Sequence, residues 1–410
     1  MKDLPISPLA PAAFPTLPPV AGMRASASRI GLYGGTRNDL LTVVFPDGAS
    51  VAGAFTRSTT RSADVEWCAT QVKKGQARAL VVNAGNSNAF TGPAGLAKNA
   101  ATVAETCRLV GCEPHEVFLA ATGVIGVPLP AQKVADALPN AFEALAAPDW
   151  ESLARAFSTT DTFPKGAGTT LDLDGTRVNL VGLAKGSGMI APNMATMLVF
   201  IFTDAAVAPT ILQTMVSAHV ETTFNAITVD SDTSTSDTLL VFATGASGAA
   251  PITEEKDPRA AKLSEALRTV FHDLALQVVR DGEGAQKLIQ IDVQGAADDL
   301  SARTIGFAIA NSPLVKTAIA GEDANWGRVI MAVGKAGEPI AIERLAVRFG
   351  GQWTAKAGGA VPYDAALVDA HMKGQLIDIL VDVGVGDGRA RVWTCDLTHG
   401  YISINGDYRS

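Results

Sequence analysis

The sequence predicts an α+β fold in which helices pack on layered sheets. Short apolar segments typical of strands occur in both halves of the chain, and segments with helical periodicity lie between some of them. The two kinds of segment do not alternate strictly, as they would in a doubly wound sheet. With 410 residues the chain also exceeds the usual size of a single core, so we expect one large domain or two intertwined ones.

The first half of the chain supplies strands that end at turns or polar loops. The apolar segment 40–45 ends at a predicted turn over 46–48, and a second strand is expected over 50–55. Residues 79–82 form a short buried strand that runs into a polar loop rich in asparagine. Residues 96–110 then have helical character.

The second half contains the clearest helix. Apolar residues recur at helical spacing over 259–279, and another amphipathic helix is expected over 209–220. After the long helix, residues 289–294 alternate between apolar and polar side chains, as a half-buried strand does. Further short strands are expected over 377–383 and 390–393, so helices and strands also mix in the C-terminal part.

The charge and the cysteines narrow the classes of function. The formal net charge is −8 without a block of like charges, so nucleic acid, whose phosphates repel an acidic chain, is not an expected partner. The four cysteines show neither a Cys-x-x-Cys pair nor a histidine at ligand spacing. We therefore expect reduced thiols and no metal site.

The N-terminal segment and the hydropathy predict a cytoplasmic protein. Residues 1–20 are rich in proline and lack the apolar core of a signal peptide. The longest strongly apolar run, 197–202, is far too short to span a bilayer. We therefore expect no membrane insertion.

The most informative segment is the glycine-rich stretch before Thr196 and the apolar run after it. A threonine hydroxyl is a weak nucleophile because it is almost fully protonated at neutral pH, so it needs a base nearby. If the bond between Ala195 and Thr196 breaks, Thr196 gains an α-amine with a pKa of about 8 on the same residue. The pattern is therefore compatible with a self-cleaved chain whose new N-terminal threonine is the nucleophile.

Two other interpretations fit the same stretch. A Gly-Ser-Gly sequence before a buried strand is commonly only a connecting loop. Gly186-x-Gly188-x-x-Ala191 also fits a loose dinucleotide-binding pattern. That pattern requires a helix after the loop, whereas Pro192 and an apolar run typical of a strand follow here, so we discount it.

Ordered blocks of the sequence resemble the bifunctional glutamate N-acetyltransferase/ornithine acetyltransferase family of arginine biosynthesis. Lys-Gly-Ser-Gly-Met-Ile-Ala-Pro-Asn-Met-Ala-Thr-Met-Leu, at 185–198, is similar to the processing-site motif of that family. The other similar blocks are 79–89, 121–126, 158–165, 229–238, 281–285, 321–327 and the C-terminal Ile-Asn-Gly-Asp-Tyr-Arg-Ser. Together they cover nearly the whole chain and are far more specific than a single motif.

The resemblance implies a layered α/β sandwich with stacked sheets, of the self-processing N-terminal-nucleophile type. It implies cleavage between Ala195 and Thr196 into an α chain, residues 1–195, and a β chain, residues 196–410. The two chains are expected to stay together, and the family suggests an assembly of two α and two β chains.

The resemblance also implies roles for individual residues. Thr196 is the expected nucleophile, and Thr122 and Gly123 are the expected oxyanion hole, where a hydroxyl and a backbone N–H meet the negative charge of a tetrahedral intermediate. The expected substrate-binding residues are Thr159, Lys185, Thr196, Glu283, Asn405 and Ser410. Taken alone, these residues would be assigned to solvated surface charges, turns and a frayed terminus.

The implied reaction is transfer of an acetyl group from N2-acetyl-L-ornithine to L-glutamate through acetyl-Thr196, with ping-pong kinetics and without a metal, nucleotide or other cofactor. The motifs leave open whether acetyl-CoA is a second donor. Two alternatives also stay open. One is a self-cleaved amidase or aminopeptidase that releases the acyl group to water, and the other is a non-catalytic metabolite-binding protein that is never cut.

Overall fold

The computed structural model describes residues 4–33, 36–191 and 197–407. The strands are β1 (Arg24–Ser28), β2 (Leu40–Phe55), β3 (Gln76–Asn86), β4 (Val117–Val124), β5 (Lys165–Leu173), β6 (Thr176–Lys185), β7 (Leu198–Thr203), β8 (Thr238–Ala243), β9 (Leu288–Ala296), β10 (Ala346–Phe349), β11 (Gln352–Lys356), β12 (Gly359–Ala360), β13 (Leu376–Asp382) and β14 (Gly388–Cys395). The α-helices are α1 (Ala63–Gln71), α2 (Gly92–Val110), α3 (Gln132–Ala135), α4 (Leu138–Glu143), α5 (Trp150–Ala156), α6 (Pro209–Val220), α7 (Pro258–Arg280), α8 (Asp299–Ala310), α9 (Pro313–Ala320), α10 (Trp326–Gly334), α11 (Ala365–Met372) and α12 (His399–Asp407). Both halves of the chain contribute helices and strands, which confirms the predicted α+β class.

Strands β1 to β8 form one mixed sheet. Neighbouring strands follow the order β4-β3-β2-β8-β7-β6-β5, and β1 pairs with β2. The pairs β3–β4 and β7–β8 are parallel, and the other neighbours are antiparallel. β7 and β8, which follow residue 196, lie between β2 and β6, which precede residue 195. Strands from the two sides of the expected cut therefore interleave within one sheet.

The eight-stranded sheet bends back on itself at β2. Its register with β3 shifts between Val44 and Ala49, so the turn predicted over 46–48 is instead a bend inside one long strand, whose second part pairs with β8. Phe118 of β4 and Phe242 of β8 lie three strand positions apart, about 14 Å in a flat sheet. Their ring centroids are nevertheless 6.0 Å apart. The two parts of the sheet therefore face each other, which confirms the stacked layers expected from the family resemblance.

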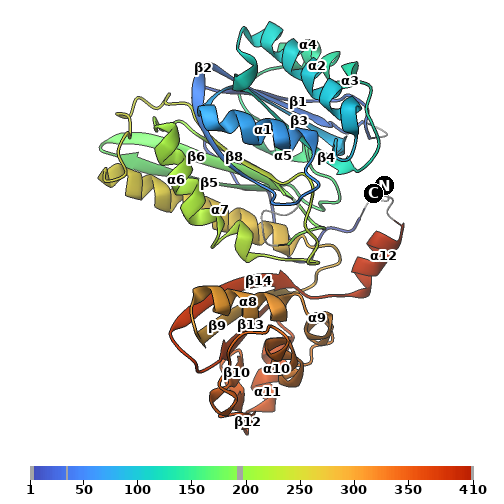
Figure 1. The fold of residues 1–410 in the computed structure, drawn as a ribbon, viewed down its shortest axis with the longest axis vertical. Helices are drawn as coiled ribbons and strands as arrows, with labels where there is room; N and C mark the ends of the chain where they lie inside the picture. Colours follow the sequence, from blue (N-terminus) through green and yellow to red (C-terminus); the bar gives the residue numbers. More distant parts are fainter. Residues whose placement is uncertain (1–3, 34–35, 192–196, 408–410) are drawn as a thin grey trace.

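Helices cover both outer faces of the folded sheet (Figure 1). α1 packs on β4 and α2 on β3 and β4, whereas α6 packs on β2 and α7 on β5 and β6. The helices predicted over 209–220 and 259–279 are confirmed as α6 and α7, with bounds that differ by at most one residue. α2 begins four residues earlier than the predicted 96–110, because Pro93 suits the first turn of a helix.

A second, smaller sheet lies in the C-terminal part, in the lower half of Figure 1. Its strand order is β12-β11-β10-β13-β9-β14. Apolar residues of β9 pack with those of α8, α9, α10 and α11 in a separate core. The polar residues between them are only partly buried, which confirms the alternation predicted over 289–294. The strands predicted over 377–383 and 390–393 are confirmed as β13 and β14.

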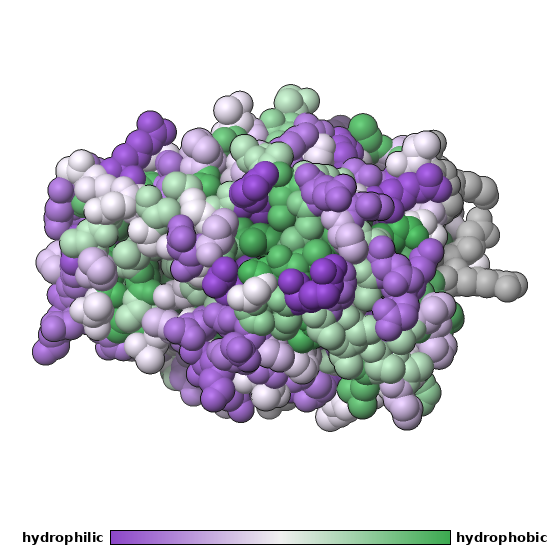
Figure 2. Space-filling view, turned by 90° about the horizontal axis from the view of Figure 1, so that it is seen from above, coloured by the Kyte–Doolittle hydropathy of each residue, from purple (hydrophilic) through white to green (hydrophobic). Residues whose placement is uncertain are grey.

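The surface mixes polar and apolar side chains. Figure 2 shows the face seen from the top of Figure 1, with an apolar area near its centre that hydrophilic side chains border. The large apolar residues that are exposed come from many elements, from Phe90 before α2 to Ile402 in α12, which is ordinary for a folded chain. No described helix has both the length and the apolar character needed to cross a membrane.

Candidate active site

The expected site residues that the structure describes meet at one edge of the eight-stranded sheet. β6 ends at Lys185, which is paired with Leu198 at the start of β7. The glycine-rich loop leaves β6 at this edge. Ala195 and Thr196, the expected cleavage site, lie outside the described residues, as does Ser410. The description resumes at Met197, one residue after the expected nucleophile.

The expected oxyanion hole lies at the carboxyl end of β4. Lys185 Nζ donates a hydrogen bond to Thr122 Oγ1 at 3.1 Å. β4 and β6 are five positions apart in the strand order, so this contact exists because the sheet folds over. Thr122 and Lys185, 63 residues apart in the chain, are thereby brought into one site with Gly123.

Gly123 is held against the neighbouring strand in a conformation that favours glycine. Its φ is 125°, and a Cβ atom would lie 2.4 Å from the carbonyl carbon of Gly85 and 2.7 Å from the nitrogen of Asn86. The backbone N–H of residue 123 can keep this position only without a side chain. The backbone of Gly123 is therefore held against β3 at the strand end that carries Thr122.

Gly123→Ala is expected to lower kcat for acetyl transfer by at least about 100-fold, because the expected oxyanion donor must move. Steady-state kinetics of the purified variant measure this. The matched control is Gly126→Ala, since Gly126 also has a positive φ of 79° but open space around it. We expect the control to lose about 1 kcal/mol of stability and little activity. Equal activity of the two variants would argue against a role for the Gly123 N–H.

Lys185 is a buried charge. Only 3% of it is exposed. Burial lowers the pKa of its ammonium group, and the carboxyl groups of Asp161, Asp237 and Glu283 act in the opposite direction. Lys185 is therefore a buried amino group among carboxyl groups, and not a solvated surface lysine.

A buried ion-pair network lies under the glycine-rich loop. Lys165 Nζ is 2.6 Å from Asp161 Oδ1 and 2.5 Å from Asp281 Oδ2, and all three side chains are almost fully buried. Asp161 also accepts hydrogen bonds from the backbone N–H groups of Thr159, at 2.8 Å, and Gly186, at 2.7 Å. The network therefore ties the expected substrate-binding residue Thr159 to the start of the loop.

The two carboxyl groups of this network titrate differently. Burial raises the pKa of Asp281 to about 6, since the attraction of Lys165 only partly offsets burial and the negative charge of Asp161. Burial also acts on Asp161, but Lys165 and Lys185 outweigh it and hold its pKa below the ordinary range. The Lys165 ammonium group therefore favours the ionised form of Asp161 over that of Asp281.

This difference predicts a pH effect on stability. A raised carboxyl pKa contributes stability that is complete below the unfolded value of about 3.9 and is lost as the pH rises through about 6. The free energy of unfolding of the wild type should therefore fall relative to that of Asp281→Asn between pH 4 and pH 7. Urea unfolding at several pH values measures this, and a constant difference between the two proteins would contradict the raised pKa.

Glu283 and Asn405 lie together beside the loop. Asn405 Nδ2 donates a hydrogen bond to Glu283 Oε2 at 2.7 Å. A Cβ atom on Gly188 would lie 2.6 Å from the carboxyl carbon of Glu283, so the loop approaches this carboxylate closely because it has a glycine there. Glu283 also lines a cavity of about 870 Å³, together with Ser187, residues 4–8 and part of α12. This size suits a small-molecule substrate.

The sequence pattern did not identify the acidic residues that support the loop. Asp230 accepts hydrogen bonds from the backbone N–H groups of Met189, at 2.6 Å, and Ile190, at 2.8 Å. Asp161, Asp230 and Asp281 all lie inside blocks that carry the family resemblance. Their place in these blocks could have marked them as candidate site residues. The backbone groups that they bind depend on the fold and could not be predicted from the sequence.

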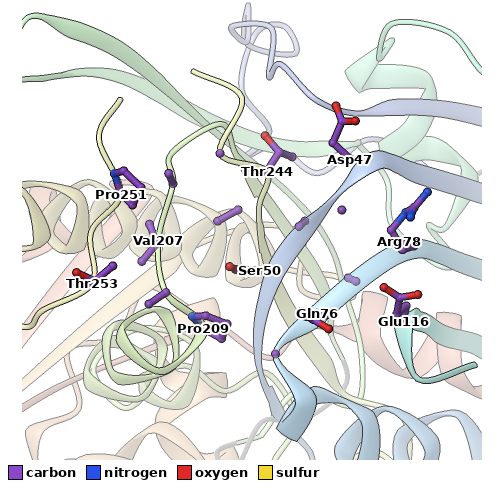
Figure 3. A pocket seen from close by; sticks show the side chains of 18 residues that line it. Asp47, Ser50, Gln76, Arg78, Glu116, Val207, Pro209, Thr244, Pro251 and Thr253 are labelled. Atoms are coloured by element: carbon purple, nitrogen blue, oxygen red, sulfur yellow. The ribbon is translucent and has the colours of Figure 1, made fainter. Parts of the chain in front are cut away.

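A smaller cavity lies away from this edge of the sheet. A cavity of about 510 Å³ is lined by Asp47, Arg78, Glu116 and Thr244 (Figure 3). It adjoins the far ends of β7 and β8, roughly 20 Å from their starts, and none of the described residues expected in the site lines it. Within the described ranges, no group of three or more His, Cys, Asp or Glu side chains could hold a metal ion.

Sequence relatives cover almost the whole chain. A sequence model of the ArgJ family matches residues 24–410. The "Arginine biosynthesis bifunctional protein ArgJ" of Zymomonas mobilis is 56% identical over 406 residues, which are 99% of each chain. The protein of the same name from Gluconobacter oxydans is 53% identical over 410 residues, 100% of this chain and 96% of the relative.

Two solved structures are similar over part of the chain. The crystal structure of arginine biosynthesis bifunctional protein ArgJ from Bacillus halodurans is 40% identical with a TM-score of 0.48, over 50% of this chain and 96% of that chain. Ornithine acetyltransferase from Mycobacterium tuberculosis, complexed with ornithine, is 29% identical with a TM-score of 0.37, over 42% of this chain and 92% of that chain. On the family match and the full-length relatives, the chain belongs to the ArgJ family of arginine biosynthesis.

Proposed function

We propose that this chain transfers an acetyl group from N2-acetyl-L-ornithine to L-glutamate through an acetyl-Thr196 intermediate, giving L-ornithine and N-acetyl-L-glutamate. Membership of the ArgJ family supports an acyltransferase of arginine biosynthesis. The observation that carries the chemistry is the hydrogen bond from Lys185 Nζ to Thr122 Oγ1. This contact lies at the sheet edge at which β7 begins. The first residue of β7, Leu198, directly follows Met197.

Self-cleavage between Ala195 and Thr196 precedes acetyl transfer in this proposal. Thr196 Oγ attacks the carbonyl carbon of Ala195, and the C–N bond breaks as the ester forms, which frees the threonine amine. Water then hydrolyses the ester, which gives the carboxylate of Ala195 and restores the threonine hydroxyl. The products, 1–195 and 196–410, would stay associated, because β7 and β8 are hydrogen-bonded between β2 and β6. We further propose an assembly of two α and two β chains that works in the cytoplasm.

In the cut enzyme, the amine of Thr196 takes the hydroxyl proton as Oγ attacks the acetyl carbonyl. The Thr122 hydroxyl and the Gly123 N–H stabilise the negative oxygen, and the loss of one such donor typically costs about 3 kcal/mol of the barrier. The Thr196 amine passes this proton to the leaving nitrogen of ornithine. The α-amine of glutamate then attacks the acetyl ester and loses a proton, and the hydroxyl of Thr196 is restored.

The remaining expected residues bind the substrate in this proposal. Lys185 suits an α-carboxylate because its buried amino group can donate hydrogen bonds to carboxylate oxygens. Glu283, oriented by Asn405 at the cavity, suits the distal ammonium group of ornithine. Thr159 and Ser410 complete the proposed contacts.

Incubation of the purified protein with N-acetylornithine tests the proposal. With glutamate present, we expect ornithine and N-acetylglutamate in equal amounts and parallel double-reciprocal plots, the signature of a ping-pong reaction. Without glutamate, mass spectrometry should find an acetyl group on Thr196. Acetate released independently of glutamate would identify an amidase, and an uncut chain without product would identify a binding protein. The same assay with acetyl-CoA as the donor decides whether the enzyme has a second activity.

A further inference from the structure

Asp237 is a buried carboxyl group beside the first residue after the expected cut. It is 0% exposed and directly precedes β8. Its Oδ1 accepts a hydrogen bond from the backbone N–H of Met197 at 2.9 Å. The carbonyl oxygen of Met197 accepts a hydrogen bond from the N–H of Thr238 at 3.1 Å. Asp237 and Thr238 therefore hold both backbone polar groups of Met197.

The backbone hydrogen bonds of the sheet do not account for the contact of the Met197 N–H. The pairing of β7 with β6 and with β8 begins at Leu198. The N–H of Met197, which belongs to the peptide bond between residues 196 and 197, instead binds a side chain. Asp237 thus holds one residue of backbone beyond the paired part of β7, on the side of the expected cut.

The second oxygen of Asp237 has no hydrogen-bond partner among the residues that the structure describes. The nearby Thr56 hydroxyl donates to the carbonyl oxygen of Ser234. The charged side chain that acts on Asp237 is Lys185. Burial raises the pKa of Asp237 well above its ordinary range, although the Met197 N–H, Lys185 and the nearby Thr56 hydroxyl act against the rise.

We propose that Asp237 is a positioning residue for self-cleavage and acetyl transfer, because it fixes the backbone from which the Thr196 hydroxyl attacks. The inference rests on the proposed cut between Ala195 and Thr196. Attack by a hydroxyl requires an oriented backbone, and a displacement of about 1 Å can cost about 100-fold in rate. Asp237 Oδ1 supplies the acceptor for the Met197 N–H, and burial favours the neutral form of this carboxyl group, which places less charge in the interior.

Three variants of the full-length chain test this role. Asp237→Ala and Asp237→Leu remove the acceptor for Met197 N–H, and leucine also fills the space. Asp237→Asn keeps an acceptor oxygen and has the shape of a neutral carboxyl group. We expect self-cleavage to be at least about 100-fold slower in the alanine and leucine variants. The asparagine variant should stay within about 5-fold of the wild type, since the hydrogen bond is kept.

Pulse–chase cell-free synthesis followed by denaturing gel electrophoresis measures the cleavage rate. Asp396→Ala is a matched control. Asp396 is also buried, accepts hydrogen bonds from two backbone N–H groups, those of Gln286 and Lys287, and has a second oxygen without a partner among the described residues. The control should lose stability in thermal unfolding but cleave at a rate within about 3-fold of the wild type, because it does not hold Met197.

The mature enzymes provide a second measurement. Asp237→Leu that has slowly matured should show a lower kcat, with KM for N-acetylornithine within about 2-fold of the wild type, because Asp237 orients the nucleophile rather than the substrate. Wild-type cleavage rates in the alanine and leucine variants would overturn the inference, as would equal slowing by Asp396→Ala or failure of asparagine to rescue cleavage. A wild-type chain that is never cut would instead overturn the proposed function.

Discussion

Replacement of Thr196 by alanine is expected to leave the 410-residue chain uncut and to abolish acetyl transfer. The hydroxyl is the proposed nucleophile in both reactions, and the α-amine that serves as base appears only after the cut. Loss of a nucleophile lowers kcat by several orders of magnitude, so we expect at least a 10⁴-fold decrease, as an order of magnitude. Denaturing gel electrophoresis and an assay for N-acetylglutamate measure the two effects.

Two further variants show whether the effect belongs to the hydroxyl of Thr196. Thr196→Ser keeps a hydroxyl group and should be cut, and it should retain acetyl transfer at a reduced rate. Thr203→Ala removes a buried threonine from the other end of β7, where its hydroxyl bonds the carbonyl oxygen of Asn179. That variant should lose stability but still be cut. A Thr196→Ala protein that is cleaved or that transfers acetyl groups would show that another residue is the nucleophile.

Replacement of Lys165 by methionine is expected to destabilise the fold by about 3–5 kcal/mol. The change leaves two buried carboxyl groups without the cation that lies between them, and an uncompensated buried charge costs an amount of this order. Acetyl transfer should fall as well, since Asp161 holds the backbone of Thr159 and Gly186. Urea unfolding and initial rates measure the two losses.

The matched control is Lys262→Met, because Lys262 is exposed on α7. We expect its free energy of unfolding to change by less than about 0.5 kcal/mol. The double variant Lys165→Met/Asp281→Asn should be more stable than Lys165→Met alone, since one of the two unpaired carboxyl groups is gone. An Lys165→Met protein as stable as the wild type would mean that the three side chains do not form the network.

Local sequence signals were most successful where periodicity is strong. The apolar stripe of α7 and the alternation of β9 depend on residues three or four positions apart and two positions apart, respectively. The bend in β2 was missed, because a proline-glycine segment that ends a strand and one that bends it look alike in sequence. The pairing of the second part of β2 with β8 decides between them.

Residue patterns and ordered motifs were enough to identify the ArgJ family, the α+β class and the candidate site residues, because they retain this information without coordinates. The sequence could not place Thr122 next to Lys185, since strand order and the folding of the sheet set that contact across 63 residues. Nor could it show that Lys185 and Asp237 are buried, and burial changes the pKa of each. The contact and the two burials follow from the three-dimensional structure, because distances and the dielectric environment depend on how the chain packs.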